Sequence, residues 1–154
     1  MKSVYDVTDE LENKLAEYTG SPYAVCLDNA SNAIFLSLYY ENHIKNNIKD
    51  ICLITSPEYI DDKTVTCLSR TYPSVPCEII HAGLKIKWEH VKGKTITGAY
   101  QLKGSCVWDS ALSFTYGMYK PKTHMCLSFT GPYKHFKLSK GGAIITDDHD
   151  AYLW

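Results

Sequence analysis

Residues 126–148, CLSFTGPYKHFKLSKGGAIITDD, decide the interpretation of this chain. The segment contains a short apolar run, a serine, a lysine in a Gly/Pro loop, a pair of glycines and a β-branched run that ends in two acids. This order predicts two strands joined by a loop that holds Lys134 near the hydroxyl of Ser128. A lysine buried at such a place can lose its proton and attack a carbonyl group. Lys134 is therefore the candidate nucleophile, and an exposed basic loop formed with Lys137 and Lys140 is the alternative.

Size and charge restrict the class of protein. The chain has 154 residues, a net charge of −1 and a hydrophobic fraction of 45%, which predicts a single domain with a substantial core. The absence of a basic excess argues against nucleic acid or an anionic membrane as a partner. The N-terminus carries no apolar leader and the chain has no long apolar run, so we expect neither a signal peptide nor a membrane span.

The cysteines and histidines do not form a metal-binding pattern. None of the six cysteines forms a CxxC pair, and most lie within apolar runs, where a free thiol behaves as a small hydrophobic side chain. We therefore expect free thiols and a cytoplasmic location. The histidine spacings match no compact ligand motif, so no metal is expected. The glycine pair at 141–142 lacks the GxGxxG pattern of a dinucleotide site and is expected to permit a turn before the last strand.

The apolar pattern predicts helices alternating with strands in the first half of the chain. Residues 6–18 have the spacing of an amphipathic helix, and residues 33–45 form a mostly apolar helix that follows a strand and a polar turn. Pro73 and Pro76 are expected to interrupt the chain before another strand, and residues 82–94 are weakly patterned. The predicted strands are 23–27, 50–55, 77–81, 95–100, 105–108, 125–129 and 143–146, with a further helix at 61–71.

These elements predict an α/β fold with three αβα layers around a mostly parallel or mixed sheet. Apolar strands that alternate with helices are typical of a sheet covered on both faces. The short links between the later strands predict that this part of the fold is antiparallel or irregular. Sites in such folds lie at the carboxyl ends of strands, where the turn at 29–32, Tyr59, Asp109 and Ser128 are expected.

Four groups, namely the turn at 29–32, Asp109, Ser128 and Lys134, together suit one kind of ligand. The turn at 29–32 opens a helix, and backbone amides there can hold a phosphate. Asp109 follows an apolar strand, and a buried carboxylate can keep a pyridine nitrogen protonated. With a serine at 128 and a lysine at 134 that can bind an aldehyde, these are the groups that pyridoxal phosphate (PLP) requires.

Three blocks of the sequence resemble the PLP-dependent sugar aminotransferases of the DegT/DnrJ/EryC1/StrS family. The first is ELENKLAEYTGSPYAVCLDNASNAIFLSL (10–38), which is similar to the opening helix, strand and phosphate-binding turn of the family. The second is CVWDSALSF (106–114), and the third is the lysine segment described above, which matches the family's SF…K…GGAI.T.D signature. The third block is the most specific, and the order of the three agrees with the family.

The resemblance assigns a role to each matching position. Lys134, seven residues before Gly141, takes the position of the lysine that binds the cofactor covalently. Asp109 takes the position that pairs with the pyridine nitrogen, and Ser128 that of the phosphate-binding serine. The remaining cofactor-binding positions are those of the phosphate turn and of the aromatic residue that stacks on the ring, here Ala30, Ser31, Asn32 and, by a looser match, Tyr59.

The chain also departs from the family pattern. Ala30 replaces a glycine of the phosphate turn, and Leu112 stands where the family usually has Gln or His near the ring. The short segment GAYQLKG at 98–104 replaces a strand-to-helix crossover. Residues 1–154 are expected to form a single reduced large domain of the family, without its C-terminal small domain.

The resemblance leaves three functional hypotheses. The first is a PLP-dependent aminotransferase-like protein, acting as a homodimer on an amino donor and a keto sugar linked to a nucleotide. The second is a non-catalytic relic that serves as a binding or assembly module, which the changes at Ala30 and Leu112 favour. The third is that a second chain supplies the missing half.

Overall fold

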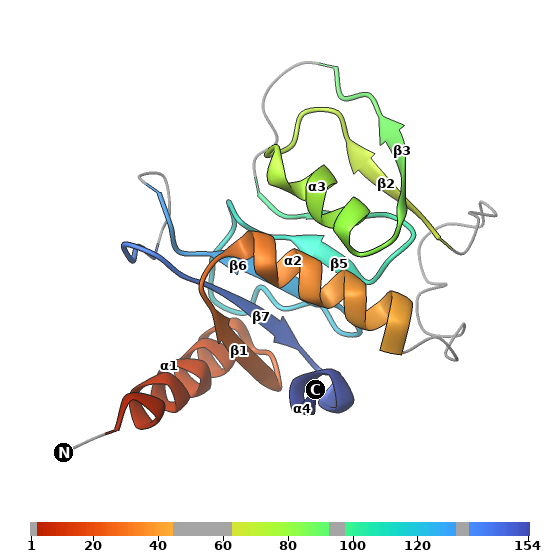
Figure 1. Cartoon of the computed structure of the whole chain (residues 1–154). Coiled ribbons are helices and arrows are strands. Elements are labelled where there is room, and N and C mark those ends of the chain that lie inside the picture. Colours follow the sequence, from red (N-terminus) through yellow and green to blue (C-terminus); the bar gives the residue numbers. More distant parts are fainter. Residues whose placement is uncertain (1–2, 45–62, 93–97, 132–135) are drawn as a thin grey trace.

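A five-stranded mixed sheet forms the centre of the fold (Figure 1). The structure is a computed structural model that describes residues 3–44, 63–92, 98–131 and 136–154. The strand order of the sheet is β1-β7-β6-β5-β4. Only β5 and β6 are parallel neighbours, while the other adjacent pairs are antiparallel. The strands are β1 (Tyr23–Leu27), β4 (Tyr100–Gln101), β5 (Val107–Asp109), β6 (His124–Ser128) and β7 (Gly142–Thr146).

Helices cover both faces of this sheet. Helix α1 (Val4–Thr19) packs on one face, where Leu15 meets Met125, Leu127 and other apolar side chains in one core cluster. Helix α2 (Ala30–Tyr39) lies on the other face, and its buried residues join Val107 and Cys126 in a second cluster. A π-helical turn, η1 (Tyr40–Ile44), continues α2. The predicted three-layer αβα arrangement with a mixed sheet is confirmed.

A smaller βαβ unit packs beside α2. Strands β2 (Thr64–Leu68) and β3 (Lys85–Glu89) are parallel and are joined by α3 (Ser74–His81). Helix α3 lies alongside α2 in Figure 1, and both contribute to the same core cluster. A single antiparallel bridge from Thr66 to Lys103 connects β2 to the segment after β4. The unit therefore forms a separate two-stranded sheet that is linked to the chain just after β4.

The prediction for this unit was wrong in both its helix and its strand. The expected helix at 61–71 contains β2, because the β-branched run TVTCL suits a strand whose central residues are buried. The expected strand at 77–81 belongs to α3. Pro73 is the N-cap and Pro76 lies in the first turn, where the missing N–H of proline has no intrahelical partner to lose. The prolines therefore open a helix here, and β3 occupies part of the weakly patterned stretch.

Several other elements agree with the sequence more closely, whereas the predicted strand at 95–100 lies partly outside the described residues and shares Tyr100 with β4. Helix α1 begins two residues before the predicted start because Ser3 forms a capping box with Asp6. Strands β1, β6 and β7 lie within a residue of their predicted bounds. The expected strand at 50–55 lies outside the described residues. The chain ends with α4 (His149–Leu153), whose Tyr152 stacks on Tyr23 of β1.

Two further findings concern membrane-spanning helices and the state of the cysteines. In the described part of the chain, no helix is both long and apolar enough to cross a bilayer. Cys26, Cys67, Cys77 and Cys126 are free, as predicted, whereas Cys106 is disulfide-bonded. The expectation of free thiols was therefore wrong for Cys106, a half-buried residue just before β5, where the sequence contains no motif that signals a pairing.

Candidate functional site

Three strands of the main sheet end at the same edge. Strands β1 and β6 are both antiparallel to β7, and β5 is parallel to β6, so the carboxyl ends of β1, β5 and β6 point the same way. The turn that opens α2 follows β1, Asp109 is the last residue of β5, and Ser128 is the last residue of β6. The structure thus brings these three predicted parts of the site to one edge.

Asp109 and Ser128 also share one face of the sheet. Asp109 is paired with Cys126 across the parallel strands, and Ser128 lies two residues beyond Cys126. Side chains two apart on a strand project from the same face, and the thiol of Cys126 contacts the Ser37 hydroxyl of α2 at 3.7 Å. Both site residues therefore face the α2 layer. Strand geometry places their backbones roughly 8 Å apart.

Gly142 lets the N-terminus of α2 rest directly on the sheet. Gly142 is the register partner of Ser128. A Cβ at Gly142 would lie 2.5 Å from the carbonyl carbon of Asn29 and 2.7 Å from the nitrogen of Ala30. Only a residue without a side chain permits this approach. This glycine therefore brings the first turn of α2 next to Ser128, a role beyond the turn that was predicted for the pair at 141–142.

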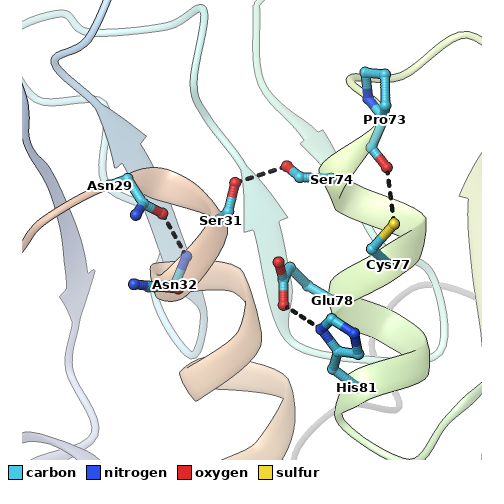
Figure 2. A network of polar contacts seen from close by, with 8 residues as sticks. All are labelled: Asn29, Ser31, Asn32, Pro73, Ser74, Cys77, Glu78 and His81. Carbon is cyan, nitrogen blue, oxygen red and sulfur yellow. Dashed lines mark hydrogen bonds and ion pairs between the residues drawn. The ribbon is translucent and has the colours of Figure 1, made fainter.

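The first turn of α2 is held by side chains on both sides (Figure 2). Asn29 is the N-cap, and its side-chain oxygen accepts a hydrogen bond from the Asn32 backbone N–H at 2.8 Å. The side-chain amide of Asn32 donates a second hydrogen bond, to the Asp28 carboxylate, at 2.6 Å. The N–H groups of Ala30 and Ser31 precede the intrahelical ladder and carry the positive end of the helix dipole. This turn is therefore prepared to hold an anion.

A second helix begins beside the first. The hydroxyl of Ser31 lies 2.6 Å from that of Ser74, the first residue of α3, and Figure 2 shows the two helices meeting through this pair. Tyr72 lies two residues before Ser74 and is 73% exposed. The sequence interpretation missed Ser74 and Tyr72 because it placed a strand where α3 lies. Correct assignment of Pro73 to a helix start would have found them.

The Asp109 carboxylate is buried and supported by two donors. The residue is 6% exposed. The Tyr100 hydroxyl donates to Oδ2 at 2.7 Å, and the Ala111 backbone N–H donates to Oδ1 at 2.9 Å. A buried carboxylate requires such partners, and each of its oxygens can accept more than one hydrogen bond. Asp109 can therefore accept a further donor from a ligand.

The negative charge of Asp109 affects its neighbours. Burial, followed by the nearby Asp109 carboxylate, raises the pKa of the Cys67 thiol to about 11. The same two causes raise the pKa of the Tyr100 hydroxyl well above its usual value. Both groups are therefore protonated at neutral pH. The buried Asp109 carboxylate is suited to interact with a cationic ligand atom.

Two predicted site residues cannot be placed. Lys134 and Tyr59 lie outside the described residues, so their roles stay predictions. Lys137 and Lys140 are exposed, and the Lys140 ammonium lies 3.7 Å from the Asp28 carboxylate. Those two lysines match the alternative of a solvated basic loop. Leu112, which replaces Gln or His of the family pattern, is 43% exposed just after β5.

Solved structures share this fold at low sequence identity. No protein-family profile and no curated protein sequence matches the chain. The chain is similar to PseC of Helicobacter pylori, an aminotransferase involved in the biosynthesis of pseudoaminic acid, with a TM-score of 0.65 and 12% identity over 95% of this chain and 46% of PseC. It is also similar to a structure of DesI that was solved in the presence of its TDP-sugar product, with a TM-score of 0.58 and 16% identity over 96% of this chain and 43% of DesI.

A third similar structure contains the cofactor. It is the E. coli GDP-4-keto-6-deoxy-D-mannose-3-dehydratase with bound hydrated PLP, with a TM-score of 0.57 and 14% identity over 94% of this chain and 44% of that enzyme. At identities this low, the similarity shows the fold alone, which this chain shares with these solved structures. The chain spans less than half the length of these structures.

Proposed function

We propose that this chain binds PLP at the edge formed by α2, β5 and β6, as an aminotransferase-like protein of sugar metabolism. One observation carries the proposal: a helix N-terminus, a serine hydroxyl and a buried carboxylate lie on one face of one sheet edge. The first two suit a phosphate, and the third suits a protonated ring nitrogen. The donor set therefore fits a phosphorylated pyridine.

Each residue of the proposed site has its own role. Ser128 and the first turn of α2 bind the phosphate. Asp109 would accept a hydrogen bond from the protonated ring nitrogen and favour its charged form. Lys134 would hold the cofactor through its aldehyde carbon, and its amine would carry a proton to and from the substrate carbon. When bound, the cofactor supplies an electron sink for the bond that is broken.

An aromatic side chain on the ring would complete the binding site. Tyr59 is the residue expected from the family resemblance. Tyr72 is a further candidate, because it is exposed next to the N-terminus of α3 and Ser74 there contacts Ser31 of the phosphate turn. Substitution of each tyrosine by Leu would identify the stacking residue, because loss of the stacked ring is expected to shift the absorption band of the bound cofactor and loss of the other tyrosine is not.

The proposed substrates are an amino donor and a keto sugar linked to a nucleotide. Their support is the similarity in fold to DesI, solved with a TDP-sugar product, and to a GDP-sugar dehydratase. We propose a homodimer as the working unit, in line with the family resemblance. Light scattering of the purified chain, with and without PLP, tests the dimer.

PLP binding is tested by titration of the purified chain. The wild type is expected to develop a visible absorption band that requires Lys134, so Lys134→Ala removes the band. Lys137→Ala is the matched control, because Lys137 is an exposed lysine of the same loop and its loss is expected to leave the band unchanged. A Lys134→Ala spectrum identical to that of the wild type would falsify the proposal.

A non-catalytic binding or assembly module is the second candidate. Leu112 favours it, because an exposed leucine stands where the family has a polar residue near the ring. Stable folding without PLP binding would support this candidate. PLP binding that depends on Asp109 and Lys134 would exclude a purely structural relic, and amino transfer that appears only with a co-purifying chain would indicate that a second protein supplies the missing half.

A further inference from the structure

Tyr100 is placed opposite Asp109 by a short hairpin. Tyr100 begins β4 and is the antiparallel register partner of Asp109 in β5. Its hydroxyl donates to Asp109 Oδ2 at 2.7 Å, while the Ala111 backbone holds Oδ1. One donor on each oxygen fixes the plane of the carboxylate, because neither oxygen can rotate without the loss of a hydrogen bond.

The same hydroxyl connects Asp109 to the βαβ unit. The Tyr100 hydroxyl also contacts the hydroxyl of Thr71, in the loop that follows β2. An ionised carboxylate only accepts, so the single proton of Tyr100 is directed to Asp109 and Thr71 must donate to the Tyr100 oxygen. A chain Thr71→Tyr100→Asp109 thus joins the segment before α3 to the end of β5. Burial and the charge of Asp109 raise the pKa of Tyr100, which keeps the donor protonated.

We propose that Tyr100 is a positioning residue that aims the Asp109 carboxylate at the ring nitrogen of the bound cofactor. This inference rests on the proposed function. Tyr100 acts through Asp109, so its contribution must depend on the ligand atom that Asp109 contacts. A tyrosine that serves only packing would affect all ligands of the site equally. The ring nitrogen therefore provides the test.

The experiment compares two ligands on four proteins. Dissociation constants are measured for PLP and for its 1-deaza analogue, in which carbon replaces the ring nitrogen, on the wild type, Tyr100→Phe, Thr71→Val and Tyr119→Phe. Tyr100→Phe keeps the ring and removes the hydroxyl, and is expected to weaken PLP binding about tenfold, the effect of one hydrogen bond to a charged group. Binding of the deaza analogue is expected to change less than about twofold.

The other variants complete the design. Thr71→Val is expected to show a smaller loss with the same selectivity for PLP, and it reports on the chain if Tyr100→Phe folds poorly. Tyr119→Phe is the matched control, because its half-buried hydroxyl bonds the Thr123 carbonyl at 3.3 Å, away from the site, and it is expected to change neither constant. Thermal denaturation of each variant confirms folding.

The outcomes separate this inference from the proposed function. In one outcome the wild type binds PLP, but Tyr100→Phe and Thr71→Val weaken the binding of both ligands equally or of neither. That result overturns the role of Tyr100 and leaves the proposed function intact. Wild type that does not bind PLP overturns the proposed function and the role of Tyr100 with it. Selective weakening of PLP binding supports both.

Discussion

The two faces of the main sheet differ in chemistry although they share the same strands. Along β6, Met125 and Leu127 face α1, whereas Cys126 and Ser128 face α2. The α1 face continues into an aromatic group in which Phe114, Phe129 and Phe136 contact one another. The α2 face includes buried polar groups that must be matched by partners, Asp109 among them.

Both faces carry an apolar core cluster, and the groups of the proposed site lie at the carboxyl end of the α2 face. Apolar side chains on the α1 face stabilise by burial alone and need no particular partner. The buried polar groups at the carboxyl end of the α2 face, which the proposed site uses, each require a neighbour that holds them. Substitutions on the α1 face should therefore change the free energy of unfolding, and those at the α2 edge should change ligand affinity more than stability.

Leu127→Ala should give the largest loss of stability. Leu127 is 1% exposed in the α1-side cluster, and its truncation leaves a cavity that costs about 2–5 kcal/mol of unfolding free energy. Urea denaturation measures this loss. Leu153→Ala, at an apolar residue that is 68% exposed, is the control and should change stability by less than about 0.5 kcal/mol. Equal effects of the two variants would contradict the packing of this face.

Gly142→Ala should disturb both properties. The new Cβ would meet the backbone of Asn29 and Ala30, so α2 must shift, which costs about 1–3 kcal/mol. Because the shift separates the helix N-terminus from Ser128, the PLP affinity should fall more than in Leu127→Ala. Titration with PLP under conditions where both variants are folded measures this. Equal PLP affinity in the two variants would argue against a phosphate site at this turn.

Asn29→Ala should have a moderate effect on stability. The variant loses the side-chain oxygen that accepts from the Asn32 N–H, and loss of such an N-cap costs about 1 kcal/mol. Asn13→Ala, in the interior of α1, serves as the control because no cap is lost there. A smaller loss in Asn29→Ala than in Asn13→Ala, by chemical denaturation, would show that Asn29 does not cap α2.

Asp28→Asn should have the smallest effect, visible only as a change with pH. The hydrogen bond from Asn32 lowers the pKa of the Asp28 carboxyl, opposed by desolvation and aided by Lys140. A folded pKa below the unfolded value gives stability that is present above the unfolded pKa and is lost as the pH falls through the folded pKa. The wild type should thus lose slightly more stability on acidification below about pH 4 than Asp28→Asn. Parallel curves of melting temperature against pH would contradict this.

The sequence predicted the fold where periodicity and local chemistry agreed. The amphipathic helix, the apolar runs of β1, β6 and β7, and the layered arrangement follow from residue patterns alone. The βαβ unit was missed because an apolar run such as CEIIH is too short to distinguish a buried strand from a helix. There the structure depends on the contact between α3 and α2, which a linear pattern does not contain.

The arrangement of the proposed site followed only partly from the sequence, and the roles of its residues stay predictions. Asp109, Ser128 and the turn at 29–32 were identified by their positions after strands, and the structure places them together. Tyr100 was not identified, because its contact with Asp109 depends on the register of a two-residue strand. Gly142 was assigned to a turn, because its contact with Asn29 joins segments that are distant in sequence.

The hydrogen-bonded pair of Tyr100 and Asp109 and the contact of Gly142 with Asn29 also imply an order of assembly. Tyr100 and Asp109 are nine residues apart, so the hairpin can bring them together early, at a small cost in loop entropy. The end of the site that we propose for the phosphate combines β1 and β7, which are far apart in the sequence, and non-local pairing of this kind forms slowly. During synthesis, therefore, the acidic end of the site can form while the phosphate end must wait until β7 has left the ribosome.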